Sequence, residues 1–221
     1  MLTLPLATPV RLLVLIGGGE FSFGETREVD ELLLAQLPAE NRTVAFLPTA
    51  SGSGEYASHF GTYLKTLDEN VNTLNVPVYR GRDVRRQRNL DAIASAGLIY
   101  LGGGVTNNLL EALRESPVDA TLRQAAEKGV AVAAIGAAAS CFGTWARDMR
   151  GSAPLAALGW LADTVVETGF EPGNDTNLRR LMSLPDVKLG IGIPAGTAVL
   201  INGDGTTKVA GSGSVAVFRK S

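Results

Sequence analysis

Short apolar runs alternate with amphipathic segments along the first 136 residues. The apolar runs are rich in Val, Ile and Leu and end in small residues, which is typical of buried strands. The segments between them repeat hydrophobic residues every three or four positions, as helices do; in the first, Val29, Leu32, Leu33 and Leu37 share one face. The pattern predicts strands over residues 11–19, 43–51, 71–79, 98–104 and 130–136, and helices over residues 27–37, 58–67, 90–97, 106–115 and 118–129.

This alternation predicts an α/β fold, because strands separated by helices pair in parallel and the helices cover the sheet. Residues 130–136, VAVAAIG, contain no polar side chain, so we expect both faces of that strand to be covered. The predicted architecture is a three-layer α/β/α sandwich with a mostly parallel sheet. Residues 189–221 differ, since short β-type runs are separated there by Gly-Asp-Gly and Gly-Ser-Gly turns. They predict a C-terminal antiparallel β extension.

Composition narrows the class of protein. The 221 residues contain no linker rich in Pro, Gly or Ser, so we expect a single domain over residues 1–221. A formal net charge of −2 argues against a nucleic-acid partner. The one cysteine rules out an intrachain disulfide and fits a reducing compartment. The first apolar run is too short to cross a bilayer, so we expect a cytoplasmic protein without a membrane partner.

Three glycine-rich turns fall at the ends of predicted parallel strands, over residues 17–24, 102–108 and 136–140. Ligands of open α/β sheets bind at this edge, and glycines let backbone N–H groups approach them closely. Thr106 or Asn107 is expected to cap the helix that follows the second turn. The positions that we expect to face a ligand are Gly18, Gly19, Gly103, Gly104, Thr106, Asn107, Gly136 and Ala137.

The same turns exclude the common cofactor motifs. Neither Gly-Gly-Gly turn has the spacing of a dinucleotide fingerprint, and no glycine-rich loop carries the Lys of a P-loop. One cysteine and one histidine do not make up a zinc site. We therefore expect no cofactor and no metal.

Several segments together resemble the dipeptidase E and cyanophycinase family of serine peptidases, whose fold is like that of class I glutamine amidotransferases. They are LIGGGEFSFG, FLPTAS, IYLGGGVTNNLLEAL, ALGWLADTVVETGF, NLRRLM and GIGIPAGTAVLI, in that order. The resemblance implies a serine nucleophile in a Gly-x-Ser-Ala-Gly-Ala turn, a histidine partner and a homodimer. It also maps Arg179 and Arg180 onto the arginines of the family, where they would bind a ligand carboxylate or form an ion pair.

The chain departs from the family at the catalytic positions. Aligning Gly136 with the first glycine of the motif puts Ala138 at the nucleophile, and Gly169 falls at the histidine. The only histidine, His59, lies on a predicted helix far from both in the sequence. A serine hydroxyl is a poor nucleophile without an adjacent base. Hydrolysis by the family route is therefore predicted to be absent.

Other residues near the turn could replace the nucleophile and the acid of the family. Ser140 and Cys141 follow the turn and are the candidate nucleophiles, and Asp148 and Glu167 are the candidate acids. We expect Cys141 to be buried and inert, Ser140 to pack in the first helical turn, and both carboxylates to be exposed.

Three functions remain open. The favoured one is a catalytically degenerate family member that binds a small acidic or peptide-like ligand. The second is an active peptidase or amidohydrolase that uses Ser140 or Cys141. The third is a structural or interaction protein that acts through a dimer surface.

Overall fold

A seven-stranded sheet forms the centre of the computed structural model, which describes residues 2–79 and 81–220. Its strand order is β11-β10-β1-β5-β4-β2-β3. The five strands from β1 to β3 in this order are parallel, while β10 and β11 are antiparallel to their neighbours. The strands are β1 Leu12–Ile16, β2 Thr43–Leu47, β3 Asn72–Asn75, β4 Leu98–Leu101, β5 Ala131–Ile135, β10 Thr197–Asn202 and β11 Thr207–Gly211. The predicted α/β fold with a mostly parallel sheet is confirmed.

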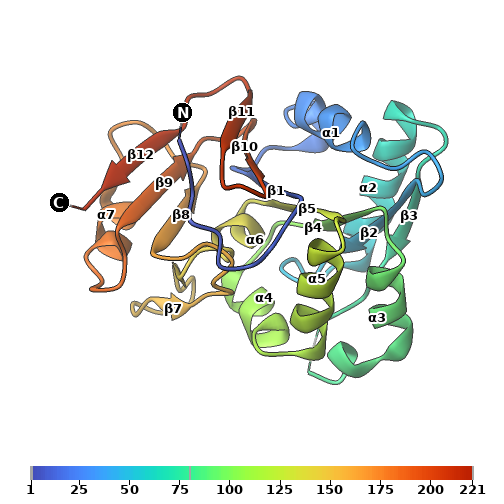
Figure 1. Ribbon diagram of the computed structural model, residues 1–221, viewed down its shortest axis with the longest axis horizontal. Coiled ribbons are helices and arrows are strands. Elements are labelled where there is room, and N and C mark those ends of the chain that lie inside the picture. Colours follow the sequence, from blue (N-terminus) through green and yellow to red (C-terminus); the bar gives the residue numbers. More distant parts are fainter. Residues whose placement is uncertain (1, 80, 221) are drawn as a thin grey trace.

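Helices cover both faces of this sheet (Figure 1). One face packs against α1 Arg27–Leu34 and α2 Gly54–Leu67, and the other against α3 Gln87–Ala94, α4 Thr106–Leu113 and α5 Pro117–Glu127. Alternate residues of each strand enter the two cores because successive side chains of a strand point to opposite faces. In β5, Ala133 joins the α1–α2 side and Val132 joins the α3–α5 side.

The α1 helix differs from its sequence prediction at two positions. Leu32 is 40% exposed, whereas Asp30 is only 1% exposed. The Asp30 carboxylate accepts hydrogen bonds from the hydroxyls of Thr26 at 2.7 Å, Tyr63 at 2.9 Å and Tyr100 at 3.3 Å. These three donors satisfy the buried carboxylate, which a hydrophobic pattern cannot reveal.

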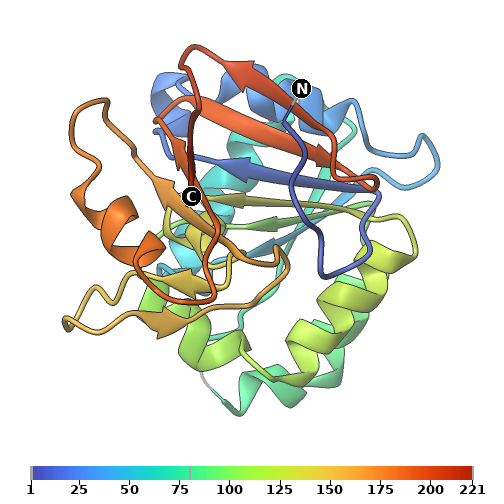
Figure 2. The ribbon, with the colours of Figure 1, turned by 60° about the vertical axis from the view of Figure 1, so that its left-hand side comes forward.

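The C-terminal strands divide between two sheets. β10 and β11 extend the main sheet as a hairpin, as predicted. β9 Leu189–Ile193 instead belongs to a second sheet, where it pairs in parallel with β8 Thr164–Thr168 and antiparallel with β12 Ala216–Arg219. Figure 2 shows this sheet, in orange and red, beside the main one. The purely antiparallel extension that we predicted therefore holds for the main sheet only.

Smaller elements complete the chain. The 3-10 helices are η1 Phe21–Phe23 and η2 Asp83–Arg85, α6 is Ala137–Ser140, α7 is Thr176–Met182, and a two-stranded sheet consists of β6 Trp145–Ala146 and β7 Leu155–Ala156. α7 packs against β8 and β9. In the described part of the chain, no helix has both the length and the apolar character needed to cross a membrane.

Candidate functional site

The sharp bend between β5 and α6 lies at Gly136. Its backbone has φ 57° and ψ −128°, a combination that residues with a side chain adopt only under strain. α/β hydrolases hold their nucleophile on such a strained strand-to-helix turn. Ala138, which the alignment placed at the nucleophile, lies inside α6 and is fully buried. The strained bend therefore lies two residues before the position that the alignment gives to the nucleophile, and it is occupied by a glycine.

Gly169, which the alignment places at the histidine of the family, also lies at the end of β1. It directly follows β8 and has φ 63°. Its N–H donates to the Gly17 carbonyl at 2.6 Å, and the N–H of Gly136 donates to the neighbouring Ile16 carbonyl at 2.9 Å. The structure therefore brings both positions to one strand end, where neither has a side chain.

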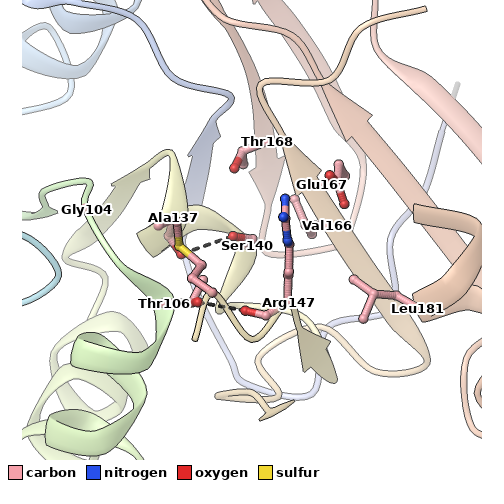
Figure 3. A pocket seen from close by; sticks show the side chains of 10 residues that line it. Gly104, Thr106, Ala137, Ser140, Arg147, Val166, Glu167, Thr168 and Leu181 are labelled. Carbon is pink, nitrogen blue, oxygen red and sulfur yellow. Dashed lines mark hydrogen bonds between the residues drawn. The ribbon is translucent and has the colours of Figure 1, made fainter. Parts of the chain in front are cut away.

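A hollow with a volume of about 190 Å³ opens beside this bend (Figure 3). We call it the first hollow. The loops after β4 and β6, the helix α6 and the strand β8 supply most of its walls. Its lining residues are Gly104, Thr106, Ala137, Ser140, Arg147, Met149, Val166, Glu167, Thr168 and Leu181. Of the glycine-loop positions predicted to face a ligand, it brings together Gly104, Thr106 and Ala137.

Close backbone contacts shape the glycine loop after β4. A Cβ on Gly104 would lie 2.4 Å from the Ala50 carbonyl carbon and the Ser51 nitrogen. Gly104 also has φ 149°, so the loop requires glycine here. The other glycine positions predicted to face a ligand, Gly18, Gly19, Gly103 and Gly136, do not line the first hollow.

Thr106 and Asn107 position the rim of the first hollow. The Thr106 hydroxyl donates to the Arg147 carbonyl at 2.7 Å. The Asn107 side chain donates to Asp148 at 2.8 Å and accepts from the Met149 N–H at 3.0 Å. The N-cap of α4 is Val105, so neither residue caps the helix as predicted; both lie in its first turn. Asn107 thus lies behind the rim and does not line the hollow.

Arg147 supplies the positive charge of the first hollow. Its guanidinium reaches toward Thr168 and Glu167 in Figure 3. The described residues place no carboxylate within 4.0 Å of this guanidinium. Sequence reasoning did not select Arg147, since it lies in an irregular loop where no periodicity marks which side chains turn inward.

The two candidate acids lie in different environments. Burial raises the pKa of Glu167, while the positive charge of Arg147 and a hydrogen bond with Asn177 oppose that shift. Hydrogen bonds from Asn107 and from the backbone of Arg150 and Gly151 lower the pKa of Asp148. Asp148 therefore holds its own loop together, and Glu167 lines the first hollow; both residues are half-buried, not exposed as predicted.

Within residues 2–79 and 81–220, neither candidate nucleophile has a hydrogen bond to a base. Ser140 lines the first hollow, but its hydroxyl donates to the Ala137 carbonyl at 3.1 Å. Cys141 is fully buried, and burial raises the pKa of its thiol. His59 lies on the exposed side of α2 and lines a different hollow, formed with η1. Thus His59 does not contact Ser140 or Cys141.

The two arginines of α7 point to different places. Arg179 pairs with Asp175 at 2.7 Å, and its guanidinium lies 5.1 Å from the centre of the Phe218 ring. Arg180 instead lines a hollow of about 190 Å³ that shares Arg147 with the first one. Of the two roles left open for Arg179, the structure shows the ion pair; ligand binding by Arg179 stays a prediction, and Arg180 is the arginine of α7 that lines a hollow. No group of three or more potential metal ligands occurs among the described residues.

Comparisons with known proteins define the class. The family model of peptidase family S51 matches residues 13–209, so the chain belongs to this family. It is 33% identical to the uncharacterized peptidase YgaJ of Bacillus subtilis (strain 168) over 135 residues. That match covers 60% of this chain and 56% of the relative, so the chain spans little more than half of the relative's length.

Solved structures show the same fold. The structure of a peptidase from an acI-B1 actinobacterium has a TM-score of 0.81 and 20% identity, and the match covers 97% of this chain and 93% of that one. A candidate peptidase E protein from Listeria monocytogenes EGD-e has a TM-score of 0.62 and 18% identity, with 96% of this chain and 100% of that one covered. The fold and the predicted family resemblance are thus confirmed.

Proposed function

We propose that this member of peptidase family S51 binds a small acidic or peptide-like ligand in the first hollow without hydrolysing it through a serine–histidine pair. The observation that carries the proposal is the glycine at the strained bend, Gly136. A Cβ there would meet open space, so the bend has room for a reacting group but supplies none.

Neither of the two groups that covalent hydrolysis requires is supplied at these positions. Covalent hydrolysis needs a nucleophile and a base that removes its proton. Gly136 and Gly169 provide neither, and the hydroxyl of Ser140 is bonded to a backbone carbonyl. Without nucleophile and base, only the modest catalysis of backbone donors and ligand binding would remain.

Arg147 is the residue that supports an acidic ligand. Its guanidinium lies at the first hollow, where its charge acts on Glu167, but no described carboxylate lies within 4.0 Å of it. Arginine binds carboxylates through two parallel N–H···O bonds, which are stronger than hydrogen bonds between neutral groups. The half-buried carboxyl of Glu167 disfavours a second anion on its side of the first hollow, so we expect only one ligand carboxylate, at Arg147.

The test combines binding and turnover. Aspartyl dipeptides are titrated calorimetrically, and the same mixtures are analysed for free amino acids. We expect heat of binding and no release. Turnover that disappears in Ser140→Ala or Cys141→Ala would replace the proposal with the active-peptidase alternative.

Restoring the missing groups tests the assignment of the bend. The double variant Gly136→Ser with Gly169→His places a hydroxyl and an imidazole at the two empty positions. We expect it to release amino acids from an aspartyl dipeptide. The matched control Ala138→Ser with Gly169→His should stay inactive, because position 138 is buried in α6. Activity in the control but not in the first variant would favour the original alignment.

The family resemblance also leads us to propose a homodimer. Light scattering coupled to size-exclusion chromatography measures the molar mass directly. A mass near 23.1 kDa, that of one chain, would contradict the dimer.

A further inference from the structure

Another hollow, which we call the second hollow, lies next to the glycine loop after β4. It has a volume of about 530 Å³ and opens between η1 and the beginning of α2. Its lining includes Glu20, Phe21, Ser51, Glu55, Tyr56 and His59. Gly19, one of the positions predicted to face a ligand, also lines it, and the proposed function gives this hollow no role.

The two hollows meet across one backbone contact. Gly104 lines the first hollow, Ser51 lines the second, and a Cβ on Gly104 would lie 2.4 Å from the Ser51 nitrogen. The Tyr56 ring packs from the second side against the same loop, 2.8 Å from where a Gly102 Cβ would be. Gly104 and Ser51 thus form a wall between the two hollows, and a ligand that crosses over this wall enters the hollow that Tyr56 lines.

The Tyr56 hydroxyl is a fixed donor at this junction. It receives a hydrogen bond from the backbone of Gly103. Its ring is held by Phe21, stacked at 6.1 Å between centroids, and by Phe46 at 5.0 Å. No described residue accepts the Tyr56 proton in a hydrogen bond, so this O–H is free to donate to a ligand oxygen. Tyr63, in the same aromatic cluster, already donates its proton to Asp30.

The two hollows, which together we call the combined surface, differ in charge. Arg147 lies at the first hollow, whereas Glu20 and Glu55 line the second. The Glu20 charge is close enough to act on the Tyr56 hydroxyl. A ligand carboxylate is therefore favoured at Arg147 and disfavoured beside Tyr56, where an uncharged carbonyl oxygen suits the free O–H.

We propose that the second hollow is a subsite for the main chain of a peptide, in which Tyr56 donates a hydrogen bond to an uncharged carbonyl oxygen of the residue next to the one held by Arg147. This inference rests on the proposed function. It specifies the ligand as a peptide with an acidic residue at one end of the combined surface and a residue without a negative charge at the other. Tyr56 is then a specificity-determining residue.

The experiment titrates three probes: the short probe aspartic acid α-amide and the longer probes Asp-Ala-NH2 and Ala-Asp-NH2. At least one longer probe should bind more tightly than the short one. Tyr56→Phe, which keeps the ring and removes the O–H, should weaken that longer probe by about 3- to 10-fold, as expected for one hydrogen bond. The same variant should leave the short probe unchanged.

Tyr63→Phe is the matched control, since it removes a hydroxyl of the same cluster that lines neither hollow. We expect it to change no affinity, and thermal melts show that both variants fold. A second measurement compares Asp-Glu-NH2 with Asp-Gln-NH2, with the two residues of each probe exchanged if Ala-Asp-NH2 is the tighter of the longer probes. The glutamate probe should bind more weakly because Glu20 and Glu55 repel its carboxylate.

The outcomes separate the two proposals. If the short probe binds and depends on Arg147 but Tyr56→Phe leaves every probe unchanged, the subsite is overturned and the proposed function stands. Equal weakening of short and long probes by Tyr56→Phe also overturns the subsite, since it indicates a general effect on the fold. If no probe binds, both proposals fail.

Discussion

Gly136 and Gly169 donate their backbone N–H groups to consecutive carbonyls at the end of β1, those of Ile16 and Gly17. This relationship places both glycines at the same strand end. Both glycines have positive φ, at 57° and 63°. The two glycines thus meet at one strand end, and neither contributes a side chain there.

Removing the charge of Arg147 should abolish most of the ligand affinity. Arg147→Gln loses a charge-assisted hydrogen bond, so we expect aspartyl peptides to bind about 10- to 150-fold more weakly. Calorimetric titration measures this. Arg179→Gln serves as the control, because Arg179 pairs with Asp175 outside both hollows. Equal losses in the two variants would show that Arg147 has no special role.

Adding a methyl group at the bend should destabilise the fold. Gly136→Ala forces a Cβ into a conformation with φ 57° and ψ −128°, at a cost of about 1–3 kcal/mol. Urea denaturation measures the change in the free energy of unfolding. Gly18, whose φ is 128°, provides a comparison, since Gly18→Ala should also destabilise while Ala137→Val, at a negative-φ helical position, should not show this strain. A Gly136→Ala variant as stable as the parent protein would contradict the strained bend.

The buried carboxyl of Asp30 should make stability depend on pH. Burial raises its pKa from 3.8 to about 6, although hydrogen bonds from Thr26, Tyr63 and Tyr100 oppose the shift. Between these values the folded state binds more protons than the unfolded state, so stability falls as pH rises from about 4 to 6 and then levels off. The free energy of unfolding falls by roughly 3 kcal/mol in total over this pH range because of Asp30.

Asp30→Asn should remove this slope, and denaturation midpoints at several pH values measure it. Asp91→Asn, on the exposed side of α3, is the matched control and should keep the slope. If the two variants have the same pH dependence as the parent protein, Asp30 does not titrate as its burial requires.

The thiol of Cys141 should be unreactive in the native protein. The side chain is fully buried, burial raises its pKa, and it is the only cysteine of the chain. A disulfide reagent that reports free thiols should therefore react with the unfolded protein about 100-fold faster or more than with the native one. The reagent reaches the buried thiol only in the small fraction of molecules whose structure has opened around it. Rapid reaction in native buffer would revive Cys141 as a candidate nucleophile.

Much of the fold follows from local pattern. The apolar runs that end in glycine became β1, β4 and β5, and alternate residues of each strand entered opposite cores. The family resemblance located the bend between β5 and α6 to within two residues. The alignment alone could not choose between Gly136 and Ala138, because glycine and alanine fill all four positions from 136 to 139.

The amino-acid sequence by itself determined the order of the first five strands and the helices between them, the family, and that the chain has a single histidine. Only the tertiary structure decided that Asp30 is buried while Leu32 is exposed, and that Arg147, not Arg179, lies at the first hollow. The physical reason is the range of the interactions. Periodicity reports which face of an element is apolar, whereas these choices depend on hydroxyls, carbonyls and carboxylates contributed by distant parts of the chain.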